Sequence, residues 1–334
     1  MLFIGWFLAG TGITVGYHRL FAHRTFKAYS FIEWIYMFLG SAALQNTIVN
    51  WCSDHRKHHK KLDTEEDPYS IKKGFIHAHI GWVVKKSSRT IENVSDLRQK
   101  SSIKFQEKFY WVIALSLSFI LPTIIGFLYE RPIGGLIWGG ILRVTLVHHF
   151  TFFINSFCHY IGQRNYDIST SARDSWIMAL LTFGEGYHNY HHKFQWDYRN
   201  GIKWYNFDPS KWIIKFMSIF SIAYELRKAP NYKIMLAKIE TVDKRIKKLS
   251  NYNKDAPYAR KIKKIINESS EKLNFLKLME FRRQKSSFKN ITKTQKIFFD
   301  KKKIQYEREV ENSLSILLDI LNRIKNKANL RSVY

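Results

Sequence analysis

Apolar runs alternate with polar, histidine-bearing stretches along the first two thirds of the chain. Residues 109–128 and 133–155 are predominantly apolar, and roughly 20 such residues are needed to cross the ~30 Å hydrocarbon core of a bilayer. Residues 2–17 are uncharged as well, and this run reaches the same length if its helix continues past His18. The pattern therefore predicts three transmembrane helices, over about 2–20, 109–128 and 133–155.

A further apolar run, residues 31–50, is interrupted by Glu33, Gln45 and Asn46. A span here would place the histidines that precede it and those that follow it on opposite sides of the membrane. Groups on opposite sides of a bilayer cannot contribute to one metal site. We therefore expect residues 31–50 to be interfacial, or packed beneath the domain that holds the histidines, without crossing the membrane.

The chain changes character near residue 228. The whole sequence carries 54 Lys+Arg against 27 Asp+Glu, a formal net charge of +27, and residues 228–334 alone hold 28 basic and 11 acidic residues. Apolar residues recur there at helical spacing, so we predict a basic, helical and partly disordered tail. We expect its partner to be membrane lipid and not nucleic acid, because no zinc-finger, RRM or KH signature is present. The predicted domains are 1–227, in the membrane, and 228–334, the tail.

Histidines gather in clusters between these runs. The spacing H-x-x-H-H occurs at residues 55–59 and again at 188–192, and His18 and His23 form a third cluster. Positions i, i+3 and i+4 of an α-helix lie within an arc of roughly 100°, so we expect the three histidines of each H-x-x-H-H motif to converge on one point. Residues five apart are separated by about 140°, so His18 and His23 need a break in the helix or must straddle the site.

One more pair completes the candidate metal ligands. Asn155 and His159 are four residues apart and share one helix face where the last predicted span ends. Eight or nine imidazoles are too many for one four-coordinate zinc ion and suit two transition metals, although spacing alone leaves iron, zinc, copper and nickel open. The expected fold is an all-α integral membrane protein, with transmembrane helices capped by a cytosolic helical domain that holds a histidine-rich dimetal site, followed by the basic helical tail.

Three stretches resemble motifs of the integral-membrane acyl-CoA Δ9 desaturases, the stearoyl-CoA desaturase family. They are GYHRLFAHR at residues 16–24, WCSDHRKHH at residues 51–59 and GEGYHNYHH at residues 184–192. Their order and spacing agree with the family, and the Gly-Glu-Gly lead of the last motif is highly specific. The resemblance covers roughly residues 5–227.

The resemblance implies a di-iron enzyme that uses O2 to insert a cis double bond at C9–C10 of a saturated C16–C18 acyl-CoA, in unsaturated fatty acid biosynthesis. Electrons would come from a separate cytochrome b5 and its reductase. The enzyme would be a multi-pass protein of the endoplasmic reticulum membrane, with its active site facing the cytosol. The di-iron centre itself would be catalytic, with no separate acid or base. The metal residues implied are His18, His23, His55, His58, His59, Asn155, His159, His188, His191 and His192.

The family's acyl-CoA tunnel implies a second set of residues. Gln45 and Thr151 match a pair that bonds across the kink of the tunnel. Trp6 and Gly10, one helical turn apart, match its far end, where Gly10 would leave room and Trp6 would restrict it. The substrate-binding residues implied are Trp6, Gly10, Gln45, Asn46, Trp51, Asp54, Lys86 and Thr151.

Two departures from the family bear on the prediction. The family has four spans, whereas the pattern here predicts three, with the family's first span missing. Some relatives carry a fused cytochrome b5 domain, whereas this chain has no histidine after His192, so we expect no such domain in the tail. Two alternatives stay open: a histidine-box lipid hydroxylase with the same metals, and a non-catalytic membrane scaffold that retains the metal site.

Overall fold

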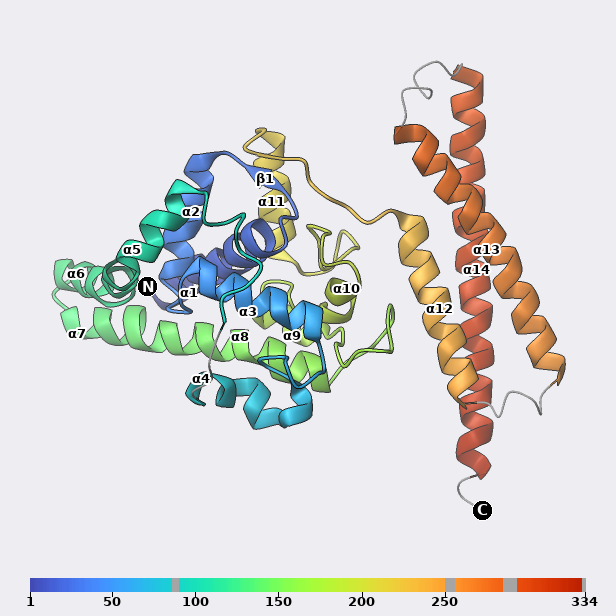
Figure 1. The fold of residues 1–334 in the computed structure, drawn as a ribbon, viewed down its shortest axis with the longest axis horizontal. Helices are drawn as coiled ribbons and strands as arrows, with labels where there is room; N and C mark the ends of the chain where they lie inside the picture. Colours follow the sequence, from blue (N-terminus) through green and yellow to red (C-terminus); the bar gives the residue numbers. More distant parts are fainter. Residues whose placement is uncertain (86–89, 250–255, 285–292, 332–334) are drawn as a thin grey trace. The chain divides into compact units, whose positions relative to one another are not determined.

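The computed structural model describes residues 1–85, 90–249, 256–284 and 293–331. This described part of the chain is predominantly helical (Figure 1). Its helices are α1 (Leu2–Thr11), η1 (Gly12–Ala22), α2 (Ser30–Ser41), α3 (Ile48–Lys61), η2 (Ile71–Lys73), η3 (His77–Gly81), α4 (Trp82–Val84), α5 (Ser101–Leu115), η4 (Ser116–Ile120), α6 (Leu121–Leu128), α7 (Pro132–Gly134), η5 (Gly135–Ile141), α8 (Leu142–Tyr160), α9 (Trp176–Leu181), α10 (His188–Lys193), α11 (Pro209–Ile219), α12 (Asn231–Leu249), α13 (Ala256–Gln284) and α14 (Lys293–Arg331).

The chain forms two compact units. Unit 1 comprises Met1–Arg164 and Thr170–Lys228, and unit 2 comprises Asn165–Ser169 and Ala229–Tyr334. The change of unit after Lys228 lies one residue from the boundary that charge and composition predict. In unit 1, the strands β1 (Lys27–Ala28) and β2 (Ala223–Tyr224) pair antiparallel and join the N-terminal helices to the segment after α11.

The described residues contain two helices that are long and apolar enough to cross a membrane, Ser101–Leu128 and Pro132–Tyr160. They include the apolar runs 109–128 and 133–155 that we predict as spans, and both helices extend beyond the predicted bounds. The first begins in a polar stretch and kinks at Phe109 (φ −116°, ψ 16°), where the apolar run starts. In each helix only 28% of the most apolar stretch is buried inside the protein, so most of it faces outward, as a lipid-exposed helix does.

Residues 2–20, expected as a third span, do not meet the same criterion of length and hydropathy. They do form a continuous helix, α1 and η1, but all of Gly12–Ala22 is buried in unit 1. The buried stretch carries His18 and Arg19, which lower its mean hydropathy. Only the first turns resemble a lipid-facing helix, with Phe3 and Ile4 largely exposed.

The range 31–50 is divided between two helices. α2 has 12 residues, which corresponds to about 18 Å of helix, well short of a bilayer core. A turn follows, and α3 begins after Thr47, whose side-chain oxygen accepts a hydrogen bond from the amide of Asn50 at 3.2 Å. No helix long enough to span lies in this range, and the turn directs α3 toward η1.

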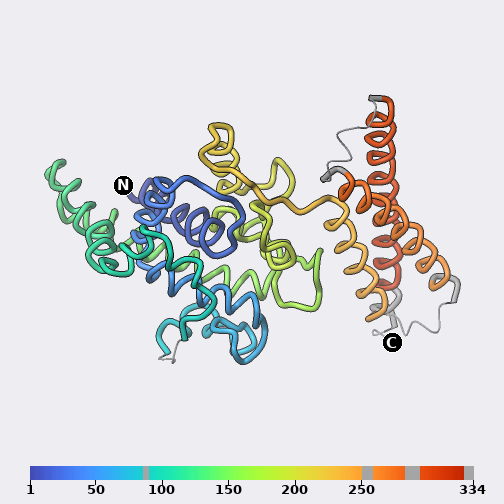
Figure 2. The backbone as a smooth tube through the Cα atoms, turned by 45° about the horizontal axis from the view of Figure 1, so that its top comes forward, coloured from blue at the N-terminus to red at the C-terminus, as the bar shows by residue number. Residues whose placement is uncertain are grey.

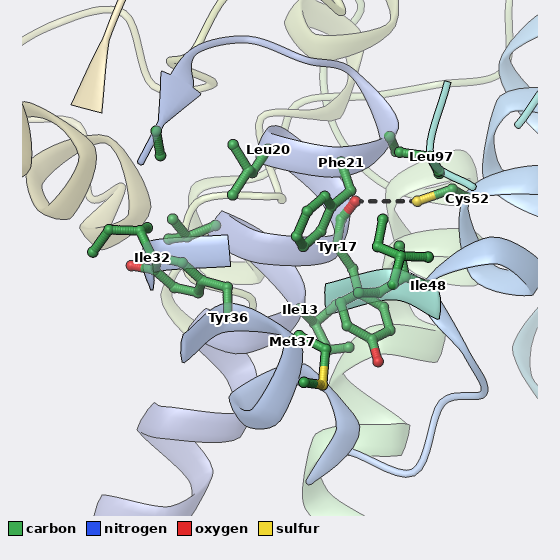
Figure 3. Packing of buried hydrophobic residues seen from close by; sticks show 14 of the residues in the cluster. Ile13, Tyr17, Leu20, Phe21, Ile32, Tyr36, Met37, Ile48, Cys52 and Leu97 are labelled. Carbon is green, nitrogen blue, oxygen red and sulfur yellow. Dashed lines mark hydrogen bonds between the residues drawn. The ribbon is translucent and has the colours of Figure 1, made fainter. Parts of the chain in front are cut away.

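Glycines let η1 and α2 approach closely. A Cβ atom on Gly12 would lie 2.4 Å from the backbone carbon of Leu39, and one on Gly40 would lie 2.2 Å from Cε1 of Tyr17. Figure 3 shows the core beside this contact, where the Cys52 thiol donates to the Tyr17 carbonyl at 3.5 Å. The close approach fixes the orientation of η1, and with it the direction in which His18 points.

The buried Arg143 of α8 faces protein and not lipid. Its Nε donates to the carbonyl of Gly139 at 3.1 Å, and its guanidinium also donates to the carbonyls of Ser118 and Ala42. The carbonyl of Ala42 lies at the C-terminal end of α2, where helix carbonyls lack intrahelical partners. Arg143 therefore ties the membrane hairpin to the end of α2.

Unit 2 is built around three helices, α12, α13 and α14, with α14 packed against both of the others (Figure 2). They enclose a separate hydrophobic core that includes Ile246, Ile262, Leu273 and Leu317. The described residues of unit 2 are thus mainly helical.

Candidate metal centre

Four elements of unit 1 bring nine histidines together. η1 supplies His18 and is followed directly by His23, while α8 supplies His159. α3 and α10 carry the two H-x-x-H-H motifs. The nine are His18, His23, His55, His58, His59, His159, His188, His191 and His192. Every histidine that the sequence marks as a candidate ligand thus lies at this one place.

The nine histidines form two adjoining groups. The first group is His18, His23, His55, His59 and His191. The second group is His58, His159, His188 and His192. Within each group the candidate ligand nitrogens lie within 4.8 Å of one another. The groups touch, because the ring centroids of His59 and His192 are 4.2 Å apart.

The expectation that each H-x-x-H-H motif converges on one point is wrong. In α3, His55 and His59 join the first group while His58 joins the second. In α10 the division is the converse: His188 and His192 share the second group, and His191 joins the first. Positions i and i+4 are offset by only about 40° on a helix, whereas the i+3 position is about 100° from i+4 and points to the neighbouring group.

The relation between His18 and His23 also differs from expectation. η1 is a π-helix, and the amide of His23 donates to the carbonyl of His18 at 3.0 Å. The wider i→i+5 turn of a π-helix places residues five apart on the same face. The two imidazoles therefore meet without a break, with ring centroids 4.8 Å apart.

The ring nitrogens are arranged as metal ligands and not as a hydrogen-bonded network. Nε2 of His191 lies 3.0 Å from Nε2 of both His18 and His59, and Nε2 of His188 has two such neighbours in the second group. A neutral imidazole nitrogen has either one proton or one lone pair, so it cannot bond well to two others. Nε2 of His58 is buried with no hydrogen-bond partner. A cation at the centre of each group would satisfy these nitrogens.

The protonation state of the site suits a metal. Burial lowers the pKa well below its ordinary value for the imidazoles of His23, His55, His59, His188, His191 and His192. These side chains are therefore neutral near pH 7 and present a free lone pair, as a metal ligand must. The donor set fits two transition-metal ions.

The buried carboxylate of Glu185 contacts Nδ1 of His18, the ring nitrogen that does not face the other histidines of the first group. Oε2 of Glu185 lies 2.9 Å from Nδ1 of His18, and Oε1 accepts from Arg19 at 3.0 Å. Arg19 also pairs with Asp208 at 2.9 Å. Burial alone would raise the pKa of Glu185, but His18 and Arg19 lower it below its ordinary value, so the carboxylate stays charged. Such partners fix the tautomer and orientation of a ligating imidazole.

Carboxylates support two ligands of the second group as well. Oδ1 of Asp67 lies 2.8 Å from Nδ1 of His58. His159 is held indirectly, because its Nδ1 lies 2.7 Å from Oγ of Ser171, which donates to Oδ1 of Asp63 at 2.5 Å. Sequence reasoning did not identify Ser171 or Asp63, which no motif contains. Glu185 lies within the motif 184–192, and Asp67 follows the motif 51–59 closely. Their place in or near the histidine motifs was the available signal.

A cavity of about 280 Å³ adjoins the histidines. Its wall includes His18, His55, His188 and Asn155, so it reaches both groups. Seven of the eight predicted substrate residues also line it: Trp6, Gly10, Gln45, Asn46, Trp51, Asp54 and Thr151. The eighth, Lys86, lies outside the described residues. The structure thus brings four of the predicted metal residues and seven of the predicted substrate residues to the wall of one cavity.

A hydrogen-bonded chain crosses this cavity. Nε2 of Gln45 donates to Oγ1 of Thr151 at 2.8 Å, and Oε1 of Gln45 accepts from the indole of Trp51 at 3.2 Å. The indole in turn stacks on His55, with ring centroids 4.8 Å apart and an interplanar angle of 22°. The expected bond between Gln45 and Thr151 is present, and it links the cavity wall to a candidate metal ligand.

Aromatic rings pack against one another in the cavity wall. Trp6 lies 4.7 Å from Phe183 and 5.8 Å from Phe150, measured between ring centroids. Gly10 does not leave this part of the cavity open, as the sequence suggested, because Phe183 occupies the adjacent space. Sequence reasoning missed Phe183, because an aromatic residue before Gly184 reads as ordinary core.

Other histidines of unit 1 lie outside the two groups. His79 contacts Oγ of Ser156 through Nδ1 and Nδ1 of His149 through Nε2, both at 3.1 Å. His148 lines the cavity and lies 2.8 Å from the carbonyl of Ala43. Each of these residues contacts a protein partner, and none of them belongs to the two groups of candidate ligands.

The family model for fatty acid desaturases matches residues 1–216. The chain belongs to the fatty acid desaturase family. All nine histidines and the cavity lie within the matched residues. The family resemblance drawn from the three sequence motifs is therefore confirmed.

Three relatives within this family show the extent of the similarity. The chain is 44% identical over 230 residues to a probable acyl-CoA desaturase of Schizosaccharomyces pombe, which covers 68% of this chain and 48% of the relative. It is 40% identical over 245 residues to acyl-CoA desaturase 1 of Saccharomyces cerevisiae, and this match covers 72% of the chain and 48% of the relative. It is 35% identical over 244 residues to stearoyl-CoA desaturase 5 of Bos taurus, and this match covers 71% of the chain and 73% of the relative. The chain thus spans about half the length of the two fungal desaturases. In each case the match covers about the length of unit 1.

Proposed function

We propose that this chain is an acyl-CoA Δ9 desaturase, which inserts a cis double bond at C9–C10 of a saturated C16–C18 acyl-CoA. The observation that carries the proposal is the cavity, in which His18 and His188, one from each histidine group, face the same space as apolar residues such as Trp6 and Phe150. An acyl chain in this space would pass directly by the candidate metals. The names of the relatives, which are acyl-CoA and stearoyl-CoA desaturases, support the same substrate class.

The overall reaction converts a saturated acyl chain, O2, two electrons and two protons into the cis-alkene and two waters. Two iron ions in the histidine groups would supply the activation of O2 and the removal of two hydrogens from adjacent methylenes. The protein's contribution is positioning. The chain of hydrogen bonds from Thr151 through Gln45 to Trp51 fixes the shape of the cavity beside His55, and therefore which methylene pair lies next to the metals.

Polar residues at the cavity wall suit the coenzyme A end of the substrate. Asn46 and Asp54 line the cavity. Oδ1 of Asn46 accepts hydrogen bonds from the Thr47 amide at 2.8 Å and from Nδ2 of Asn50 at 2.9 Å. We assign Asn46 and Asp54 to coenzyme A binding, together with Lys86. Asn155, at the same cavity wall, would bind iron through a water.

The membrane hairpin supports a single-sided arrangement. The helices Ser101–Leu128 and Pro132–Tyr160 are joined by the short turn 129–131. Their other ends therefore lie on the same side of the bilayer, and His159 lies at that side. We assign that side to the cytosol and the membrane to the endoplasmic reticulum, with electrons delivered by cytochrome b5 and its reductase.

The decisive experiment is expression of the whole chain in yeast lacking its own Δ9 desaturase, with fatty acids analysed by mass spectrometry. The expected products are C16 and C18 acids with one cis double bond at C9–C10. Hydroxylated acids in their place would favour the lipid hydroxylase. Absence of any new product, from a protein that holds two irons per chain, would favour the non-catalytic scaffold. An engineered glycosylation site in the turn 129–131 tests the topology, since it should be modified only on the lumenal side.

A further inference from the structure

We propose that one end of the three-helix bundle of unit 2 binds the surface of an anionic membrane. This end is formed by residues 277–282 of α13 and 294–304 of α14, on either side of the grey trace that joins these helices in Figure 1. The two segments lie level with each other, because Leu276 and Met279 line the same small cavity as Phe299. We call these two segments the bundle tip.

Large apolar side chains protrude from the bundle tip. Five of them are about half exposed: Leu278 (57%), Phe281 (54%), Ile297 (48%), Phe298 (55%) and Ile304 (58%). A soluble helical bundle buries such residues on one stripe of each helix, and unit 2 already has its own core elsewhere on these helices. A concentration of exposed apolar side chains indicates a surface that contacts another apolar phase or partner.

Basic side chains are interleaved with these apolar ones. The exposed ones are Lys277, Arg282, Lys296 and Lys301. Residues 277–282 and 294–304 together hold six basic residues against two acidic ones, Glu280 and Asp300. Basic residues alternating with protruding aromatic and aliphatic ones are typical of segments that lie on a membrane, where lysines meet lipid phosphates and apolar tips enter the headgroup boundary.

The bundle tip lies near the point at which the chain enters unit 2. Pro230 and Tyr232 line the same small cavity as the tip residues, so the chain enters the bundle at this end. Unit 1, with its two candidate spans, ends at Lys228, immediately before this entry. A short covalent tether gives a weak lipid-binding surface a high effective concentration of membrane.

The combination of charges and apolar groups favours lipid over an acidic protein. A partner recognised through charge alone would not require Phe281, Phe298 and Ile304 to protrude into solvent. A lipid surface satisfies both features, since each basic residue near an anionic surface strengthens binding about fivefold and each buried apolar group adds to it. This inference is independent of the proposed catalytic activity.

The test uses an environment-sensitive fluorophore on the whole chain, reconstituted in nanodiscs of neutral phosphatidylcholine with or without an anionic phospholipid. Cys52 and Cys158 are fully buried, so a single introduced cysteine can be labelled selectively. The tip probe is Thr294→Cys, and the matched control is Ser315→Cys, an exposed position further along the same helix α14.

We expect the Thr294 probe to shift to shorter wavelength only in anionic discs, and the Ser315 probe to remain unchanged. Lys296→Gln with Lys301→Gln should weaken the response about 25-fold with respect to anionic lipid content. Ile297→Ser with Phe298→Ser should also weaken it, whereas Ile316→Ser with Leu318→Ser, two exposed apolar residues away from the tip, should not.

An equal response of the two probes, or equal spectra in neutral and anionic discs, overturns the proposal. A shift of the Thr294 probe caused by a soluble acidic protein in neutral discs, without a response to anionic lipid, replaces the lipid by a protein partner. Circular dichroism of each variant checks that the bundle keeps its helix content, so a null response cannot be attributed to unfolding.

Discussion

Phe183 fills the space beside Gly10. A Cβ atom on Gly10 would lie 2.2 Å from Cε2 of Phe183, and the same phenyl ring packs on Trp6. A residue from the loop before Gly184 and one from α1 therefore pack together in the cavity wall. These two elements are far apart in sequence.

This contact predicts a coupled change in substrate length. Phe183→Leu shortens this side chain of the cavity wall, so products of longer acyl chains should increase relative to C16. Gly10→Ala alone should lower activity, because Phe183 must move, and adding Phe183→Leu should restore part of it. Mass spectrometry of cells fed saturated acids of graded length measures both effects. Phe26→Leu, in the core away from the cavity, should leave the product profile unchanged.

The division of each H-x-x-H-H motif predicts how metal sites are lost. His55→Ala with His59→Ala removes two ligands from the first group and should leave one tightly bound iron. His58→Ala with His59→Ala removes one ligand from each group and should weaken both sites. Metal analysis after dialysis against a weak chelator distinguishes the two cases. Equal iron content in the two double variants would contradict the division.

Support of His18 by Glu185 predicts a loss of metal affinity without loss of the ligand itself. Glu185→Gln should lower the affinity for metal by about 10- to 100-fold, because the imidazole loses the carboxylate that orients it. Competition with a chelator of known affinity measures the change. The matched control is Glu225→Gln, whose carboxylate is largely exposed and pairs with Lys27 at 2.7 Å. Unaltered affinity in Glu185→Gln would rule out this role.

The hydrogen bond between Gln45 and Thr151 predicts the position of the double bond. Gln45→Leu removes the partner of both Thr151 and Trp51, so the acyl chain is no longer held in one register. Desaturation should become slower, by about 100-fold for a misplacement near 1 Å, and should spread to positions next to C9–C10. Ozonolysis or derivatised mass spectra locate the double bonds. A single product at C9–C10 with full activity is the result that would count against this assignment.

The close approach of η1 and α2 predicts a stability difference between two glycines. Gly40→Ala places a methyl 2.2 Å from Tyr17, and overpacking of this kind costs about 1–3 kcal/mol. At Gly134 the nearest atom to an added Cβ is 3.7 Å away, so Gly134→Ala should be neutral or slightly stabilising. Melting temperatures in detergent compare the two. Iron content should fall with Gly40→Ala, since η1 carries His18.

The sequence was sufficient to identify which residues meet at the centre. The repeated H-x-x-H-H spacing indicated six of the nine histidines, and the pairs His18/His23 and Asn155/His159 indicated the other three. The apolar runs predicted three spans, and two of them lie in helices long and apolar enough to cross a membrane. These signals are local. The sequence could not predict that His58 and His191 join a different histidine group from the other two histidines of their motif. That division depends on the direction in which each helix points. The π-helical turn between His18 and His23 likewise depends on packing against α2, which no local pattern reveals.

Residues outside the motifs were harder to anticipate for a related reason. Ser171 and Asp63 act on His159 only because two loops meet in space, and their spacing in sequence has no period. Phe183 lies next to a recognised motif, but its ring can occupy this position only because Gly10 has no side chain. The early start of the first span followed from a polar helix that continues, with a kink, into the apolar run at Phe109.

Because α3 and α10 each contribute to both histidine groups, neither helix can turn or slide without disturbing both. The two groups are interlocked, because His58 of α3 belongs to the second group and His191 of α10 belongs to the first, apart from the other two histidines of each motif. Any widening of the cavity that leaves both histidine groups intact must therefore involve other walls, such as the rings around Trp6. The separation between the two histidine groups is thus set by the geometry of single helical turns, which is among the least deformable in a protein.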